Sequence, residues 1–177
     1  TEFIAPRELD FRHGTYVKMD GVCHSYLFIP SARYRMQVPA GWMSLLVNAG
    51  EGIDVDLFLY KQDKAKTVER IGRRIRLNRS KLKDASDTNT DFDDLAESIQ
   101  AGYYLKNGLA ANEEFYYVCI LITITGYSPK EAEWRAKEMR KLLNAQDMEA
   151  VSCIFKEEQA FFSALPLLNL DKSIYAR

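Results

Sequence analysis

Strands are indicated where hydrophobic and polar positions alternate. The strongest signal covers residues 115–125, because both alternating sets of positions are largely apolar. One set comprises Val118, Ile120, Ile122 and Ile124, and the other comprises Tyr117, Cys119, Leu121 and Thr123. A strand that is apolar on both faces is typical of the centre of a sheet. Residues 53–60 and 148–155 predict two further strands.

A β-hairpin is predicted near the start of the chain. Asp20-Gly21 separates two strand-like runs, residues 16–19 and 22–29. Glycine accepts the positive φ of a type I′ turn, the two-residue connection that suits adjacent antiparallel strands.

Helices are predicted where apolar residues recur every three or four positions. Residues 63–82 follow this period, and Leu95, Ile99 and Tyr103 resume it after a polar segment, residues 84–94, that predicts a loop. A short helix is expected over residues 39–46, ended by Gly50. Ser128-Pro129-Lys130-Glu131 is a capping box, which predicts a helix to about Asn144.

These elements predict an α+β fold with a mixed β-sheet, an N-terminal hairpin and about four covering helices. The strand, helix and strand of residues 115–155 would place the last two strands parallel, if they share a sheet. We expect residues 1–177 to form a single domain.

Composition limits the classes of protein to which this chain can belong. The 177 residues are 47% hydrophobic and 28% charged, as in globular domains, and a net charge of -1 argues against a uniformly basic nucleic-acid binder. Three cysteines without CxxC spacing lie in apolar runs and predict buried, reduced thiols, which suit the cytosol. No signal peptide or membrane-spanning run is evident, and the missing initiating Met indicates a segment of a longer chain.

Nucleotide hydrolysis is not expected of this segment. A phosphate-binding loop needs converging glycines followed by Lys and Ser or Thr, yet the chain has no Gly-Lys pair. Gly50-Glu51-Gly52 precedes a strand and is interpreted as a turn. We therefore predict no catalytic residue, no nucleotide-binding residue, no metal ligand and no cofactor in this segment.

Histidines and paired acids are candidate catalytic or metal-binding groups. His13 and His24 lack the spacing that brings two imidazoles to one metal, and we favour structural or surface roles. Asp54 and Asp56 share one strand face and could bridge a divalent ion, although two outward acids are commoner. An enzyme using Asp54, Asp56 and His24 is a third hypothesis.

Arginines concentrate on the helix predicted for residues 63–82. Arg70, Arg73, Arg74 and Arg76 could contact the phosphates of a nucleic acid. We favour a solvated face balanced by the acidic segment 84–97, because no aromatic residue is interleaved with these charges.

An apolar tail closes the chain. Its candidate interface residues are Phe161, Phe162, Leu165, Leu167 and Leu168. Either this tail folds back onto the core, or it contacts a segment that lies beyond these residues.

The strand at 53–60, the basic helix and above all Phe161-Phe162-Ser163-Ala164-Leu165-Pro166-Leu167 resemble the N-terminal domain of VirB/TraE-type ATPases of conjugation and type IV secretion, especially from mobile elements. In that family a similar Phe-Phe-x-x-Leu-Pro stretch precedes the ATPase domain. The resemblance implies that residues 161–177 are a linker toward that domain.

This resemblance also implies a function. The segment would be a non-catalytic docking domain on the cytoplasmic face of the inner membrane, within a parent that binds ATP and Mg. Its expected partners are the parent's ATPase domain, inner-membrane channel proteins and further copies of itself. A nucleic-acid-binding module using residues 70–83 is the alternative.

Overall fold

The computed structural model describes residues 5–30, 38, 40–84 and 90–175. The chain divides into two compact units. Unit 1 comprises Thr1–Phe58 and Val118–Arg177, and unit 2 comprises Leu59–Tyr117.

The sheet has six strands, and its order along one path is β1-β2-β3-β5-β4. Their bounds are β1 Leu9–Asp10, β2 Val17–Met19, β3 Val22–Ile29, β4 Ile53–Lys61, β5 Tyr116–Gly126 and β6 Val151–Ser152. The predicted hairpin is confirmed, because Asp20 and Gly21, both at positive φ, connect β2 to β3. The α+β class is confirmed as well.

Strand pairing corrects one part of the prediction, because the sheet is antiparallel rather than mixed. β3 pairs antiparallel with β2, β5 and β6. Thr125 donates its N–H to Gly52 and Gln62 donates to Phe115, so β4 and β5 share one continuous antiparallel register. β6 is only two residues long, not 148–155, and β3 lies between it and β5, so the two run in the same direction without being neighbours.

β5 lies inside the sheet, and its two faces belong to two separate cores, as its alternation predicted. One core contains Ile120, Ile122 and Ile124, with the buried side chains of the helix that follows β5. The opposite core contains Cys119 and Leu121. All residues from Cys119 to Ile124 are buried.

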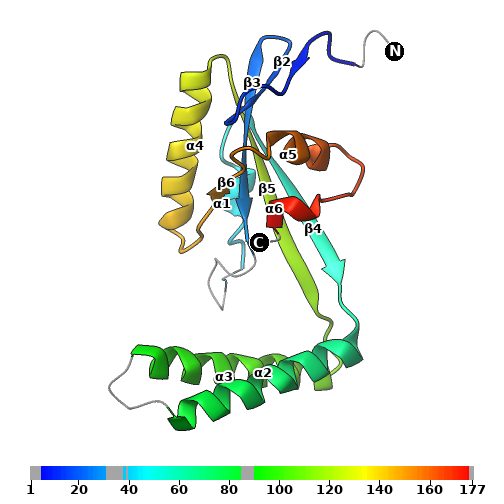
Figure 1. Cartoon of the computed structure of the whole chain (residues 1–177), viewed down its shortest axis with the longest axis vertical. Helices are drawn as coiled ribbons and strands as arrows, with labels where there is room; N and C mark the ends of the chain where they lie inside the picture. The colour runs from blue at the N-terminus through cyan, green and yellow to red at the C-terminus, as the bar shows by residue number, and fades with distance from the viewer. Residues whose placement is uncertain (1–4, 31–37, 39, 85–89, 176–177) are drawn as a thin grey trace. The chain divides into compact units, whose positions relative to one another are not determined.

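Helices cover both faces of the sheet in unit 1 (Figure 1). The helices of this unit are α1 Ser44–Val47, α4 Pro129–Asn144, α5 Glu157–Ala164 and α6 Lys172–Tyr175. α4 packs on the face of Ile122, and α5 and α6 pack on the face of Leu121. The predicted Ser128 cap is confirmed, since Ser128 Oγ accepts from the N–H of Glu131. The reciprocal bond of the capping box differs, because the Glu131 carboxylate accepts from the N–H of Tyr127 and not from that of Ser128.

Unit 2 contains two 21-residue helices, α2 Lys64–Asp84 and α3 Thr90–Ala110, which lie side by side in Figure 1. Asn78 of α2 is buried and donates to Ser98 Oγ of α3 at 2.8 Å. A Cβ on Gly102 would lie 2.7 Å from Ile75, so the glycine permits this close packing. The predicted loop is shorter than expected, because residues 90–94 are already helical; residues 85–89 lie outside the described residues.

Gly126 at the end of β5 provides a test of the packing between β5 and α4. A Cβ at this position would lie 2.6 Å from the backbone nitrogen of Ala132, and backbone cannot move aside as a flexible side chain can. Gly126→Ala should therefore lower the free energy of unfolding by about 1–3 kcal/mol in urea denaturation. The control is Gly72→Ala inside α2, where the nearest atom is the flexible Arg76 Nη1 at 3.7 Å, and where stability should rise by about 0.5–1 kcal/mol. Equal effects would contradict the packing described.

Candidate interaction surfaces

The apolar tail is partly folded onto unit 1 and partly exposed. Phe161 and Ala164 of α5 pack against the core that contains Leu121, and Leu170 and Ile174 are buried in it. Of the candidate interface residues, Phe161 and Leu165 are half-buried, whereas Phe162, Leu167 and Leu168 are exposed. Folding back onto the core therefore applies to part of the tail, and contact of the exposed residues with a segment beyond this chain stays a prediction.

A loop between α5 and α6 presents the most exposed of these side chains. Ser163 is buried, donates to the carbonyl of Gln159 and accepts from the N–H of Asp171 at 2.9 Å, which closes the loop. Leu167 is 66% exposed and Leu168 is 89% exposed. Leu168 also has φ of 55°, a conformation that costs a branched residue about 1–2 kcal/mol. We call residues 165–169 the leucine loop.

An aromatic cluster packs against α5, the helix that precedes the leucine loop. The rings of Phe11 and Phe161 lie 5.4 Å apart edge to face, and Phe162 stacks on Phe11 at 6.0 Å. The N-terminal strand region is therefore joined to α5 by three phenylalanines. Phe162 keeps 48% of its surface exposed beside them.

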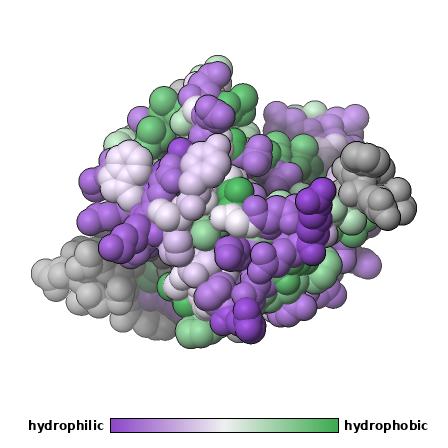
Figure 2. Space-filling model, turned by 90° about the horizontal axis from the view of Figure 1, so that it is seen from above, coloured by the Kyte–Doolittle hydropathy of each residue, from purple (hydrophilic) through white to green (hydrophobic). Residues whose placement is uncertain are grey.

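Exposed apolar residues are scattered on the face of the molecule drawn in Figure 2, where hydrophilic residues predominate and hydrophobic ones form small separate patches. A surface of this kind is ordinary for a folded chain. Apolar area on this face therefore does not by itself mark a binding site.

The basic residues of α2 acquire aromatic neighbours that the sequence did not reveal. Arg70 lies over the ring of Tyr117, with 5.3 Å between the guanidinium carbon and the ring centroid. Arg79 donates weakly to the Tyr103 hydroxyl at 3.4 Å. Arg73 pairs with Glu69 at 2.9 Å. The two tyrosines belong to β5 and α3, so linear proximity on α2 could not show them.

Arg74 and Arg76 are exposed and make no ion pair or hydrogen bond with the residues that the structure describes. Within unit 2, the side chains described in the acidic segment begin at residue 92. The prediction that acidic residues 84–97 balance the charge of these arginines thus falls partly outside the described residues. The candidate arginines all lie on one helix, as predicted.

His24 lies on β3, and Asp54 and Asp56 lie on β4, two strands that are separated by β5; none of the three lines either of two cavities found in unit 1. His24 Nδ1 is 3.2 Å from Thr125 Oγ1. Burial lowers the pKa of His24, with a smaller opposing effect of Asp54, and burial followed by Asp54 raises the pKa of Asp56. No His, Cys, Asp and Glu side chains in the described part of the chain form a metal-binding group. The hypothesis of an enzyme that uses Asp54, Asp56 and His24 gains no support.

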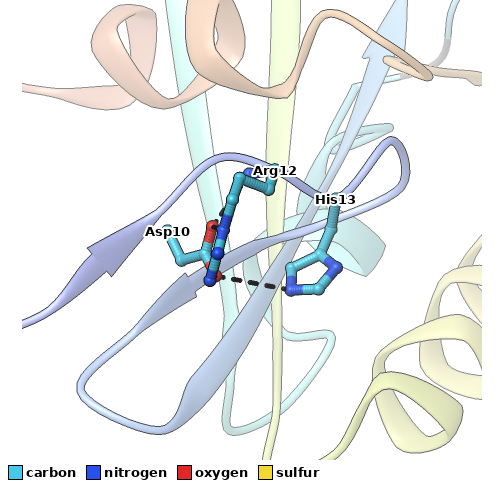
Figure 3. Close-up of polar contacts among 3 residues, drawn as sticks. All are labelled: Asp10, Arg12 and His13. Carbon is cyan, nitrogen blue, oxygen red and sulfur yellow. Dashed lines mark hydrogen bonds and ion pairs between the residues drawn. The ribbon is translucent and has the colours of Figure 1, made fainter.

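His13 belongs to a polar cluster at the turn after β1 (Figure 3). Asp10 accepts from Arg12 Nε at 2.9 Å and Nη2 at 2.7 Å, and these bonds hold the pKa of Asp10 far below its usual range. His13 Nε2 lies 3.7 Å from the same carboxylate, and its ring stacks on Tyr16 at 4.4 Å. The cluster orders the chain locally, in keeping with a structural role.

The cysteines are free and buried, as predicted. Burial raises the pKa of Cys23 and Cys119, and raises that of Cys153 to about 12. Because the thiolate is the reactive form, these thiols are poor nucleophiles at neutral pH.

One cavity is an open groove of about 630 Å³ beside α4, which the sequence reasoning missed. Trp134, Leu142 and Ile53 contribute to its lining. Its one sequence signal is the spacing of Trp134, Glu138 and Leu142, which puts an exposed tryptophan and a leucine on the same side of a helix. In the helices that the structure describes, no segment has both the length and the apolar composition for crossing a membrane.

The lowered pKa of His24 predicts a pH dependence of stability. Because the folded state favours the neutral imidazole, its contribution is present above the unfolded pKa of about 6.5 and is lost as pH falls through the folded pKa. Denaturation of the wild type and His24→Asn at several pH values should show the wild type losing more stability between about pH 7 and pH 5. A difference that stays constant, or that grows in the opposite direction, would refute this account of His24.

Comparison with known proteins does not assign the chain to a family. A scan against family models finds no match, and a search of curated proteins finds no matching sequence.

Proposed function

We propose that this segment is a non-catalytic assembly and docking domain of a conjugative, type IV secretion ATPase. The leucine loop carries the proposal. Ser163 and Asp171 hold it closed, yet Leu168 stands almost fully exposed in a backbone conformation that glycine would adopt at lower cost. Retaining a large apolar side chain there is understandable if the side chain contacts a partner.

The proposed setting follows from the family resemblance. The partners are the parent's ATPase domain, channel proteins of the inner membrane and neighbouring copies of the domain. ATP and Mg belong to the parent, and residues 161–177 lead toward it. The domain would work on the cytoplasmic face of the membrane as a peripheral component.

Leu168→Gly separates docking from stability. The substitution removes an exposed side chain and relieves the positive φ, so the thermal midpoint should stay equal or rise. Binding to the ATPase domain encoded by the same reading frame should weaken about tenfold, equivalent to about 1.4 kcal/mol. Asn112→Gly, which relieves φ of 72° in unit 2, is the matched control and should leave binding unchanged.

Two results would end the proposal. One is a reading frame beyond Arg177 without a Gly-x-x-x-x-Gly-Lys-Ser/Thr motif, because the ATPase domain would then be missing. The other is unchanged binding of Leu168→Gly, which would remove the role of the leucine loop.

A second candidate function is binding of single-stranded nucleic acid by α2. The observation that favours it is the placement of Tyr117 under Arg70 and of Tyr103 beside Arg79, since single-strand binders combine cations with aromatic rings. In the sequence, no aromatic residue is interleaved with the arginines of α2, which disfavoured nucleic-acid binding. These contacts bring two tyrosines of other elements beside arginines of this helix.

Replacing Arg70, Arg73, Arg74 and Arg76 together with alanine tests this second function. Affinity for a labelled single-stranded DNA should fall, and the slope of log K against log salt should decrease by up to about 3, at about 0.7 for each lost phosphate contact. Lys130→Ala with Lys137→Ala on α4 is the control, because both lysines are exposed outside α2. No binding by the wild type at low salt would discard the hypothesis.

A further inference from the structure

β4 is the last strand of the described sheet, and its outer edge has no strand partner among the described residues. Gly52 accepts from Thr125 of β5, so even-numbered residues direct their backbone groups toward β5. Odd-numbered residues, namely Ile53, Val55 and Leu57, therefore direct their N–H and C=O groups toward the open edge. An edge of this kind is a template for another strand, and proteins usually protect it.

Two of the usual protections, proline and lysine, are absent from this part of β4. Residues 53–58 contain no proline and no lysine, and all belong to one continuous strand. Leu57 is 42% exposed. Within the described part of the chain, the edge is therefore open to backbone pairing at three outward residues.

A groove accompanies this edge on the α4 face of the sheet. It has a volume of about 630 Å³ and lies between Glu51 and Ile53 on one side and Trp134, Glu138 and Leu142 of α4 on the other. Trp134 is 61% exposed, although tryptophan is among the most favourable side chains at interfaces. A strand added to β4 would lay alternate side chains along this groove.

Arg135 fixes the groove before any partner arrives. Its Nη1 donates to the carbonyls of Glu51 at 3.2 Å and Thr125 at 3.0 Å, and its Nη2 pairs with Glu131 at 2.8 Å. These bonds hold the beginning of β4 against α4. A preformed site avoids part of the entropic cost of binding.

The two faces of β4 differ in charge, so a strand added beside β4 would meet acidic side chains on one face only. Asp54 and Asp56 lie on the opposite face of β4 from Ile53 and Val55, and neither forms an ion pair with a described residue. Burial, followed by the nearby Asp54 carboxylate, raises the pKa of Asp56, and a cation beside Asp56 would favour its ionised form. Basic side chains on an added strand would meet these acids.

We propose that the β4 edge and the α4 groove bind an extended segment of another protein in which basic and apolar residues alternate. The segment adds a strand to β4, its apolar side chains enter the groove beside Trp134, and its basic side chains lie along Asp54 and Asp56. Backbone pairing supplies affinity, and the two different faces supply specificity. This surface is separate from the leucine loop and does not depend on the function proposed for it.

The direct test is hydrogen exchange with a synthetic eight-residue peptide of alternating lysine and valine. Binding should slow exchange at the amides of Ile53, Val55 and Leu57, which face outward, while neighbouring even-numbered amides change little. A peptide of alternating glutamate and valine should bind at least about tenfold more weakly, since its charges repel Asp54 and Asp56. A peptide with four lysines followed by four valines has the same composition and should also bind weakly.

Two substitutions separate backbone pairing from contact in the groove. Leu57→Pro removes one outward N–H and should abolish the slowed exchange, whereas Leu57→Ala keeps that N–H and should preserve it. Trp134→Ala should weaken the lysine and valine peptide about tenfold, and Tyr127→Ala, at a residue 76% exposed near the start of α4, should not. Slow exchange of the β5 amides in each variant verifies that the sheet is intact.

Three outcomes would overturn the proposal. They are unchanged exchange at Ile53, Val55 and Leu57, equal binding of the three peptides, and a concentration-dependent dimer that protects the same amides without peptide. The last result would assign the edge to a second copy of this chain.

Discussion

The structure depends on one strand that must be removed from water on both faces. β5 is buried from Cys119 through Ile124, and each fully buried Ile or Leu contributes about 1.5–3 kcal/mol relative to exposure. One layer of helices cannot cover such a strand. α4 covers one face of β5, and α5 and α6 cover the other.

This requirement explains why the C-terminal segment is folded as it is. The apolar residues of α5 and α6 complete the second core, so Leu170 and Ile174 are buried while the leucine loop between the helices stays exposed. Unit 2 is built differently. Among its described residues few side chains are buried, namely Thr67, Ile75, Asn78 and Leu109, and two long helices expose most of their surface. A pair of helices with a thin core is better suited to offering surfaces than to enclosing a site.

The sequence predicted what depends on local periodicity and capping. The two faces of β5 follow from alternation, and the start of α4 follows from Ser128 and Glu131, whose contacts span only a few residues. Strand pairing was harder to predict from the sequence, because β6 pairs with β3, which lies more than a hundred residues earlier. This pairing is antiparallel, and the sheet is therefore antiparallel where a mixed sheet was predicted.

Candidate sites were harder to predict for the same reason. Tyr103 and Tyr117 reach the arginines of α2 from other elements, and the groove combines α4 with residues preceding and opening β4. The tail residues were found because they are adjacent in sequence. Which of them would be exposed could not be found, because Ser163 and Asp171 set the shape of the loop through a contact between its two ends.

Excising the helical pair tests the central claim that β5 and its two covering layers form a self-sufficient unit. Tyr60 and Tyr117 face each other in the register of β4 and β5, so Asn-Gly can replace residues 61–116 as a two-residue turn. The shortened chain should unfold cooperatively in urea, with its slowest-exchanging amides in residues 119–124. A chain without a cooperative transition or protected β5 amides would contradict this account.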